Sequence, residues 1–399
     1  MRLLHTSDWH LGRSFHREGM LDHQAVFVDH LVDVVERERV DLVVVSGDVY
    51  DRALPHVDAV RLADETLARL AASRARVVIT SGNHDSAQRL GFSSRLIDAA
   101  GVFIRTDASG IGIPVLLGDE HGPVAVHGIP YLDPESVREP WGLAARSHEA
   151  ALTEAMRRVR ADLAARPAAT RSVVLAHAFV AGGEPSESER DISVGGVSMV
   201  PTSLFDGVTY TGLGHLHGRH TLTGAVRYSG SPLAYSFSEA AHRKGSWLVE
   251  LGPAGLGAVE FVDAPVPRPL ARLRGTLEEL LTSADHGRHE GSWVQATLTD
   301  PVRPLQAMER LRARFPHALV LAFDPAGDRP AGPPAVRTEG RSDHAVALEF
   351  VEAVRGAPAA EDESALLQVA CEACCDDPDV DTWISEAADP VRSVAWEPR

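Results

Sequence analysis

The chain alternates short apolar runs with longer stretches of helical periodicity. Turn residues bound the apolar runs, as is typical of buried strands, and the runs are Leu3-Leu4, Val40 to Val45, Val77 to Ile79, Val173 to Ala176 and Val208 to Leu213. Apolar residues between Val26 and Val35 recur on one helical face, and residues 57–72 and 152–165 predict two further helices. Strands that alternate with helices predict an α/β domain whose helices cover a sheet on both faces.

Polar residues of metal-binding types follow each predicted strand. In chain order they are Asp8 and His10, then Asp48 and Asp51, then Asn83, His84 and Asp85, then His177, and finally His215 and His217. Because sites form at the carboxyl ends of strands in open α/β sheets, we expect these side chains to converge. Glycines 47, 82 and 214 suit tight turns that bring the backbone close to a ligand. His215 and His217, two apart on a strand, are expected to face the same way.

Each of these motifs taken alone has an ordinary interpretation. An Asp-x-His pair is common by chance, and a single His177 is more often a hydrogen-bonded core histidine. The ordered set at five strand ends favours a metal site instead. Asp, Asn and His without Cys point to Mn²⁺, Fe²⁺ or Zn²⁺ rather than to an all-oxygen Mg²⁺ or Ca²⁺ site. The candidates exceed the needs of one ion, and two ions about 3.5–4 Å apart, bridged by a carboxylate, would suit phosphate-ester hydrolysis.

Composition shifts divide the chain into four parts. They are a first domain over 1–264 that ends within the Pro-rich "DAPVPRPL", a small α/β cap over 265–325, a Pro/Gly linker over 326–340, and C-terminal helices with an acidic tail over 341–399. In the cap, Thr276 to Leu281 and Leu305 to Phe315 predict helices, and Trp293 to Leu298 and Ala318 to Phe323 predict strands. Asp343 to Val354 and Ser364 to Cys374 predict the last two helices.

Charge and composition restrict the function only weakly. The net charge is −17, but residues 361–399 hold eleven acids and two arginines, a net −9, so acidity weakens a nucleic-acid interpretation without excluding it. Lys244 is the only lysine, which leaves any phosphate contacts to arginine; the cap, with eight arginines and seven acids, is no strong basic patch. Cys371, Cys374 and Cys375 form a poor zinc site and are expected to stay reduced thiols.

No targeting or membrane segment is visible. No run of about 18 apolar residues occurs, and "MRLLHTSDWH" carries charge and histidine where a signal peptide needs an apolar stretch. The expected location is the cytoplasm.

The ordered set DxH, GDxxD, GNHD, a later His and GHxH resembles the calcineurin-like metallophosphoesterase superfamily. The resemblance implies an α/β fold of central mixed sheets flanked by helices, with two divalent metal ions. Carried over residue by residue, it implies that Asp8, His10 and His217 bind one ion, that Asn83, His177 and His215 bind the second, and that Asp48 bridges them. His84 corresponds to the family's non-ligand histidine, which contacts the scissile phosphate and protonates the leaving oxygen. Asp51 and Asp85 are interpreted as braces for the loops and histidines.

Longer blocks that extend beyond these motifs resemble the SbcD family, the nuclease subunits of bacterial SbcCD exonucleases. They include "SGDVYDRALPHVDAV", "SGNHDSAQRLGFSSRL", "HGIPYL" and, most specifically, the segment around Tyr228 to Glu239. The resemblance implies a Mn²⁺-dependent nuclease, 3′ to 5′ exonuclease on double strands and endonuclease on single strands and hairpins, that hydrolyses phosphodiesters with a water activated by two metal ions during DNA repair. It also implies an SbcC-like SMC-type ATPase as partner, DNA ends and hairpins as substrates, and a homodimer within a heterotetramer.

The C-terminal helices resemble the region by which the family docks on its ATPase partner, and the resemblance implies that they form the partner-docking surface. Their apolar residues are Leu348, Phe350, Val351, Val354, Leu366, Leu367 and Val369. Alternatively, these helices simply pack on the cap.

Two other functions stay open on the sequence. A phosphoesterase for small nucleotides or phosphoproteins would use the same core motifs. A non-catalytic subunit that binds DNA ends is the second alternative; loss of a ligand would mark it, and none is missing.

Overall fold

The structure is a computed structural model that describes residues 1–192, 199–325 and 341–375. These residues fall into two units, one over Met1–Asp324 and one beyond it. The predicted linker over 326–340 and the tail from residue 376 lie outside the described residues.

The first of two six-stranded sheets carries three of the five predicted strands. Its order is β14-β13-β1-β4-β5-β6. The strands are β1 (Arg2–Thr6), β4 (Leu42–Ser46), β5 (Arg76–Thr80), β6 (Val102–Arg105), β13 (Gly245–Gly252) and β14 (Gly255–Asp263). β1, β4, β5 and β6 are parallel, whereas β13 runs antiparallel to both β1 and β14. The carboxyl ends of β1, β4 and β5 therefore share one edge.

The second sheet carries the other two predicted strands. Its order is β11-β12-β10-β9-β8-β7, and its strands are β7 (Val115–Asp119), β8 (Gly122–Ile129), β9 (Arg171–His177), β10 (Tyr210–Gly214), β11 (His220–Thr221) and β12 (Val226–Tyr228). β8, β9, β10 and β12 are parallel, and the outer strands β7 and β11 are antiparallel to their neighbours.

The two sheets pack on each other through a buried apolar layer. It includes Leu3, Val44 and Val78 from the first sheet and Val126 and Leu175 from the second. The expectation of one sheet covered by helices on both faces was therefore wrong, because each sheet has helices on one face only and the other sheet on its second face. The broader fold class, α/β with mixed sheets flanked by helices, is confirmed.

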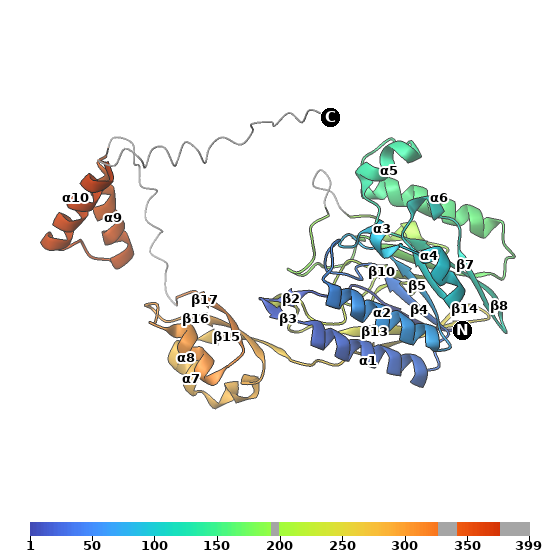
Figure 1. Ribbon diagram of the computed structural model, residues 1–399, viewed down its shortest axis with the longest axis horizontal. Coiled ribbons are helices and arrows are strands. Elements are labelled where there is room, and N and C mark those ends of the chain that lie inside the picture. Colours follow the sequence, from blue (N-terminus) through green and yellow to red (C-terminus); the bar gives the residue numbers. More distant parts are fainter. Residues whose placement is uncertain (193–198, 326–340, 376–399) are drawn as a thin grey trace, which may run out of the picture. The chain divides into compact units, whose positions relative to one another are not determined.

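Amphipathic helices cover the outer face of each sheet (Figure 1). α1 (Leu21–Arg37) buries Phe27 and Leu31, and α2 (Val57–Ala72) buries Ala63 and Leu70, against the first sheet. α6 (His148–Ala164) and the shorter α5 (Pro134–Trp141) add apolar residues such as Met156 to the core of the second sheet. α3 (Ala87–Leu90) and α4 (Ser94–Ile97) are single turns after β5. The sequence of layers is thus helix, sheet, sheet, helix.

A small three-stranded parallel sheet follows the two large ones. Its strands are β15 (Leu270–Gly275), β16 (Trp293–Leu298) and β17 (Ala318–Phe323). Two helices connect them, α7 (Leu277–Thr282) and α8 (Ala307–Arg314). Thr276 caps α7 in a capping box with Glu279. Trp293 packs with Phe15 and Phe237 in a separate apolar cluster. Phe15 belongs to the hairpin of β2 (Ser14–Phe15) and β3 (Glu18–Gly19). This cluster joins the small sheet to the loops near the strand ends.

The second unit contains two helices, α9 (Asp343–Arg355) and α10 (Glu361–Cys375). α10 starts three residues before the predicted Ser364, because Glu363 accepts from the backbone N–H of Ala360 and pairs with Arg355. The cysteine cluster falls on the last turns of α10. Among the residues that the structure describes, no helix is long and apolar enough to cross a membrane.

Candidate metal centre

The predicted site residues gather where the strand ends of the two sheets meet. β4 and β9 come together there, since His177 Nδ1 donates to the Ser46 carbonyl at 2.9 Å. The loop after β1 lies on the loop after β4, because the Asp8 N–H donates to the Gly47 carbonyl at 3.1 Å and the His10 N–H to the Asp48 carbonyl at 3.0 Å. Residues far apart in the chain are thereby held in one buried cluster.

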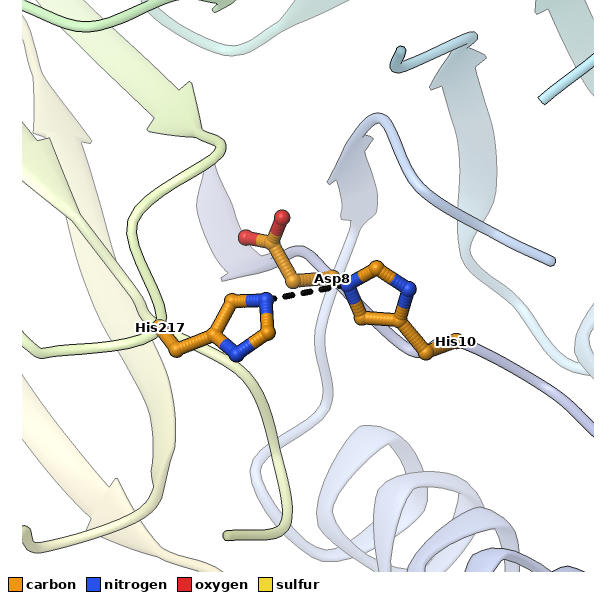
Figure 2. Close-up of side chains that lie close together, drawn as sticks. All are labelled: Asp8, His10 and His217. Atoms are coloured by element: carbon orange, nitrogen blue, oxygen red, sulfur yellow. Dashed lines mark hydrogen bonds between the residues drawn. The ribbon is translucent and has the colours of Figure 1, made fainter. Parts of the chain in front are cut away.

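Asp8, His10 and His217 form the first group of candidate ligands, shown in Figure 2. All three are buried, and the two ring Nε2 atoms of His10 and His217 are 3.0 Å apart. The Asp8 carboxylate accepts from the His215 N–H at 3.0 Å, which ties this group to the loop after β10.

Asn83, His177 and His215 form the second group. The Asn83 side-chain oxygen lies 2.8 Å from His177 Nε2 and 3.2 Å from His215 Nδ1. Asn83 Nδ2 is buried and has no hydrogen-bond partner among the described residues. The oxygen, rather than the amide nitrogen, thus faces the two imidazoles, as a metal-binding amide must.

Asp48 lies between the two groups. Its Oδ2 is 3.7 Å from His10 Nε2 in the first group and 3.4 Å from His177 Nε2 in the second. Its Oδ1 accepts from the His84 N–H at 2.8 Å, so the carboxylate is held in place by the loop after β5. This is the position that a bridging carboxylate requires.

The backbone around the site is unusual. Asp8, His10, Asp48 and His215 all have positive φ, at 53°, 47°, 51° and 105°, a conformation that non-glycine residues rarely adopt and that tends to cluster at functional sites. His215 and His217 lie beyond β10, which ends at Gly214, so the expectation that both stand on a strand was wrong. The turn after Gly214 places them in different groups.

The buried charges favour a bound cation. Burial alone would raise the pKa of Asp48, but His177, His10 and His84 outweigh it and hold that pKa well below its usual value. Burial would likewise lower the pKa of His177, but the Asp48 carboxylate raises it to about 9. Burial lowers the pKa of His215 to about 3, so this ring is neutral at pH 7 and has a nitrogen lone pair available for a metal ion. The negative potential that retains a proton on His177 would equally retain a metal ion.

The residues fit a pair of divalent cations. Two imidazole nitrogens of the first group point at each other, and an amide oxygen and two imidazole nitrogens converge in the second. The Nδ1 of His177 donates to a backbone carbonyl, which directs Nε2 toward Asn83 and Asp48, the arrangement by which backbone partners orient metal-binding histidines. The arrangement of Asp8, His10, Asp48, Asn83, His177, His215 and His217 therefore fits a site for two metal ions.

The other three predicted residues surround the dimetal site. His84 Nδ1 donates to the Asp51 carbonyl at 2.7 Å, so Nε2 is directed away from that bond, and a ring nitrogen of His84 lies within 4.8 Å of His10 and Asp48 donor atoms. The Asp85 carboxylate accepts from the N–H groups of Gly82, Val49 and Tyr50, which joins the loops after β4 and β5. Asp51 Oδ1 lies 3.8 Å from His10 Nδ1.

Sequence reasoning missed a buried network behind His217. His217 Nδ1 is 2.6 Å from Ser188 Oγ, which donates to Glu239 Oε1 at 2.6 Å. Glu239 forms an ion pair with Lys244, and Lys244 Nζ also donates to the His217 carbonyl at 2.8 Å. The His217 N–H in turn donates to Glu189 at 2.7 Å. The signal was the single lysine of the chain, five residues after the acid that ends the block around Tyr228 to Glu239.

Comparisons with known proteins agree with this geometry. The calcineurin-like phosphoesterase family profile matches residues 1–218. A second profile, SbcD_C, described as "Type 5 capsule protein repressor C-terminal domain", matches residues 266–355.

Two similar solved structures are distant in sequence. The protein TT1561 of Thermus thermophilus is 14% identical and covers 66% of this chain and 98% of its own, with a TM-score of 0.38. A dimetal phosphatase from Danio rerio is 16% identical and covers 66% of this chain and 99% of its own, with a TM-score of 0.41. At these TM-scores neither protein informs the substrate of this chain.

Two packed sheets whose strand ends gather a dimetal site define a metal-dependent hydrolase. The family match extends over more than half of the chain and covers every candidate ligand. The chain belongs to the calcineurin-like phosphoesterase family.

Proposed function

We propose that this protein is the DNA nuclease subunit of an SbcCD-like repair complex. The observation that carries the proposal is the order of domains: a complete set of dimetal residues within 1–218 is followed, on the same chain, by the SbcD_C match over 266–355. The activities are those of the family it resembles, a 3′ to 5′ double-strand exonuclease and an endonuclease on single strands and hairpins.

The residues suit attack on a phosphodiester. Two divalent ions, for which Mn²⁺ is our proposal because Asp, Asn and His supply the donors, would lower the pKa of water and offset charge on the phosphate oxygens. His84 is the proposed catalytic residue. Its Nδ1 is committed to the Asp51 carbonyl, which leaves Nε2 to contact the scissile phosphate and to protonate the leaving oxygen. Burial lowers the pKa of His84, and the negative charge of a bound phosphate would raise it again.

An SbcC-like SMC-type ATPase is the proposed partner, with α9 and α10 as the docking element. No residue with an assigned exposure in these two helices is buried; Phe350 is 65% exposed and Leu366 is 71% exposed. Apolar helix faces that remain uncovered are typical of helices that bind another chain. A homodimer through the helices of the first domain, within a heterotetramer, completes the proposal.

Cleavage of a labelled DNA hairpin tests this function. Wild type and His84→Ala are compared in Mn²⁺ and in Mg²⁺, each with and without the ATPase partner, and a nitrophenyl phosphodiester is hydrolysed in parallel. We expect Mn²⁺-dependent cutting by the wild type and little by the variant.

The parallel assay separates the alternatives. Hydrolysis of the nitrophenyl ester without DNA cutting under any condition would contradict the nuclease and favour a small-nucleotide or phosphoprotein phosphoesterase. Absence of both activities in protein that contains metal would favour a non-catalytic subunit that binds DNA ends.

A further inference from the structure

Beside the metal centre, arginines and aromatic rings stack in alternation. Trp247 of β13 and Phe261 of β14 contact edge to face, with ring centroids 4.9 Å apart. The guanidinium of Arg219 lies over both rings, 4.5 Å from Phe261 and 5.6 Å from Trp247. Arg227 covers Trp247 at 4.8 Å, and Arg243 covers Phe261 at 5.9 Å. Three positive charges are therefore held along the joint between the two sheets.

Two of these charges have no carboxylate partner among the described residues. The Arg219 side chain makes neither a hydrogen bond nor an ion pair with any of them, and Arg227 donates only to the Thr221 hydroxyl and the Gly224 carbonyl. Arg243, in contrast, forms a two-pronged ion pair with Asp263. In a chain with 56 acids and 39 basic residues, two adjacent half-buried arginines without a carboxylate are unexpected.

The stack begins beside the candidate ligands. Arg219 is two residues after His217 in the same loop. Trp247 pairs with His5 of β1, the strand that leads into Asp8. A strand whose phosphodiester enters the metal centre would thus pass this joint within a short distance.

Stacked guanidinium groups suit phosphate binding. An aromatic ring fixes the plane of the guanidinium, whose N–H groups match phosphate oxygens in a forked geometry. Arg227 keeps a second hydrogen on each terminal nitrogen beside its bonds to Thr221 and Gly224. Rigid placement also reduces the side-chain entropy that is lost on binding.

We infer that Arg219 and Arg227 bind the sugar–phosphate backbone of the nucleic-acid strand that is cleaved. The inference rests on the proposed function and assigns to it contacts that neither family match identifies. The other possibility is that the stack only fastens the edges of the two sheets, and the test distinguishes the two.

Binding of a fluorescein-labelled single-stranded oligonucleotide to the full chain, without metal and in EDTA, is measured by anisotropy over a range of salt concentrations. We compare wild type, Arg219→Gln, Arg227→Gln and Arg219→Lys. Each loss of a phosphate contact should lower affinity about 3- to 10-fold at ~0.1 M salt and reduce the slope of log K against log salt by about 0.7. Arg219→Lys keeps the charge and should keep most of the slope.

Arg157→Gln is the matched control, because it removes the same charge from an exposed arginine on α6 whose partner Glu154 retains Arg158. Its slope should equal that of the wild type. Equal slopes for wild type, Arg219→Gln and Arg227→Gln, in a protein that binds and cuts DNA, would overturn this inference and leave the nuclease intact. A wild type that neither binds nor cuts DNA, yet hydrolyses the nitrophenyl diester, would overturn both.

Discussion

Ser188 shows how a residue without metal chemistry can control a ligand. Its hydroxyl accepts from His217 Nδ1 and donates to Glu239, so the His217 ring is fixed in the tautomer whose Nε2 carries the lone pair. Burial would raise the pKa of Glu239, but Lys244 and His217 hold it well below its usual value, which keeps this carboxylate a permanent acceptor.

Ser188→Ala should therefore weaken metal binding by about 10- to 100-fold, because the His217 ring loses the partner that orients it. Calorimetric titration of the metal-free protein with Mn²⁺ measures the effect. Ser136→Ala is the control, since this exposed hydroxyl donates only to the helix-capping Asp133. An affinity equal to that of the wild type would show that the network does not orient the ligand.

Asp48→Ala and His84→Ala separate metal binding from phosphate handling. The Asp48 carboxylate lies between both groups of donors, so its loss should remove bound metal along with activity. His84 is assigned to the phosphate, so His84→Ala should keep the metal and lose cleavage by about 10²- to 10⁴-fold. Metal content by mass spectrometry and phosphodiester hydrolysis are measured on the same samples. A loss of metal in His84→Ala would show that the assigned separation of roles is wrong.

The sequence predicted which side chains cluster at the candidate metal site better than it predicted the residues that support them. Each of the seven candidate ligands follows a recognisable strand. Ser188, in contrast, lies outside the helices and strands, and Glu239 lies in a single 3-10 turn, so both acquire their role only when the chain folds. The positive φ of Asp8 and Asp48 was equally invisible, because no glycine marks those two positions.

At the scale of elements, glycines allow the strand ends to approach one another. A Cβ added to Gly214 at the end of β10 would lie 1.8 Å from the Ser46 carbonyl oxygen at the end of β4. Gly47 has a φ of +84°, and an added Cβ would lie 2.4 Å from His177 Nδ1. The two sheets can join at the site only if these positions carry no side chain.

Gly214→Ala should destabilise the protein by at least about 3 kcal/mol, because the backbone of β4 or β10 has to move. Urea unfolding measures the loss, and a metal titration shows whether the site is distorted as well. Gly224→Ala is the control, since nothing lies within 4 Å of its added Cβ. A stability close to that of wild type for Gly214→Ala would mean that the sheets can separate without cost.

Elements with strong apolar periodicity were predicted closely, and those set by tertiary contacts were not. α2 occupies the predicted residues 57–72, and β16 the predicted Trp293–Leu298. The antiparallel pair β7 and β8 escaped notice because Gly118 and Pro123, paired across it, interrupt the alternation. The loop that carries His215 could not be distinguished from a continuing strand by spacing alone.

At the scale of the whole molecule, the pairing of two sheets could not be read from the order of strands, since both halves show the same β-α alternation. One polar contact in the structure helps to hold the two sheets together. Arg171 of β9 donates to the Leu251 carbonyl of β13 at 3.0 Å and pairs with Asp119 of β7. A buried guanidinium thus fastens the second sheet to the first.

This contact predicts a pH dependence of stability. The Arg171 guanidinium holds the pKa of Asp119 well below its usual value, so the pair stabilises the native state above about pH 4 and loses this contribution as the pH falls further. Asp119→Asn should lower the free energy of unfolding by about 2–3 kcal/mol at pH 7, because Arg171 stays buried without its carboxylate.

Urea unfolding of both proteins at pH 7 and pH 3 tests this. The difference between wild type and variant should shrink at pH 3. If the free energies of unfolding of wild type and variant differ by the same amount at pH 7 and at pH 3, the ion pair between Arg171 and Asp119 does not stabilise the protein as assigned.

The burial of Lys244 has a consequence for chemical labelling. This chain has no other lysine, and the Lys244 amine is enclosed by Glu239, Ser231 and the His217 carbonyl. Amine-directed crosslinkers and acylating reagents will therefore find no reactive side-chain amine on the folded protein. Any acylation of Lys244 will report that the region behind His217 has opened, which makes this single lysine a built-in probe of local unfolding at the metal centre.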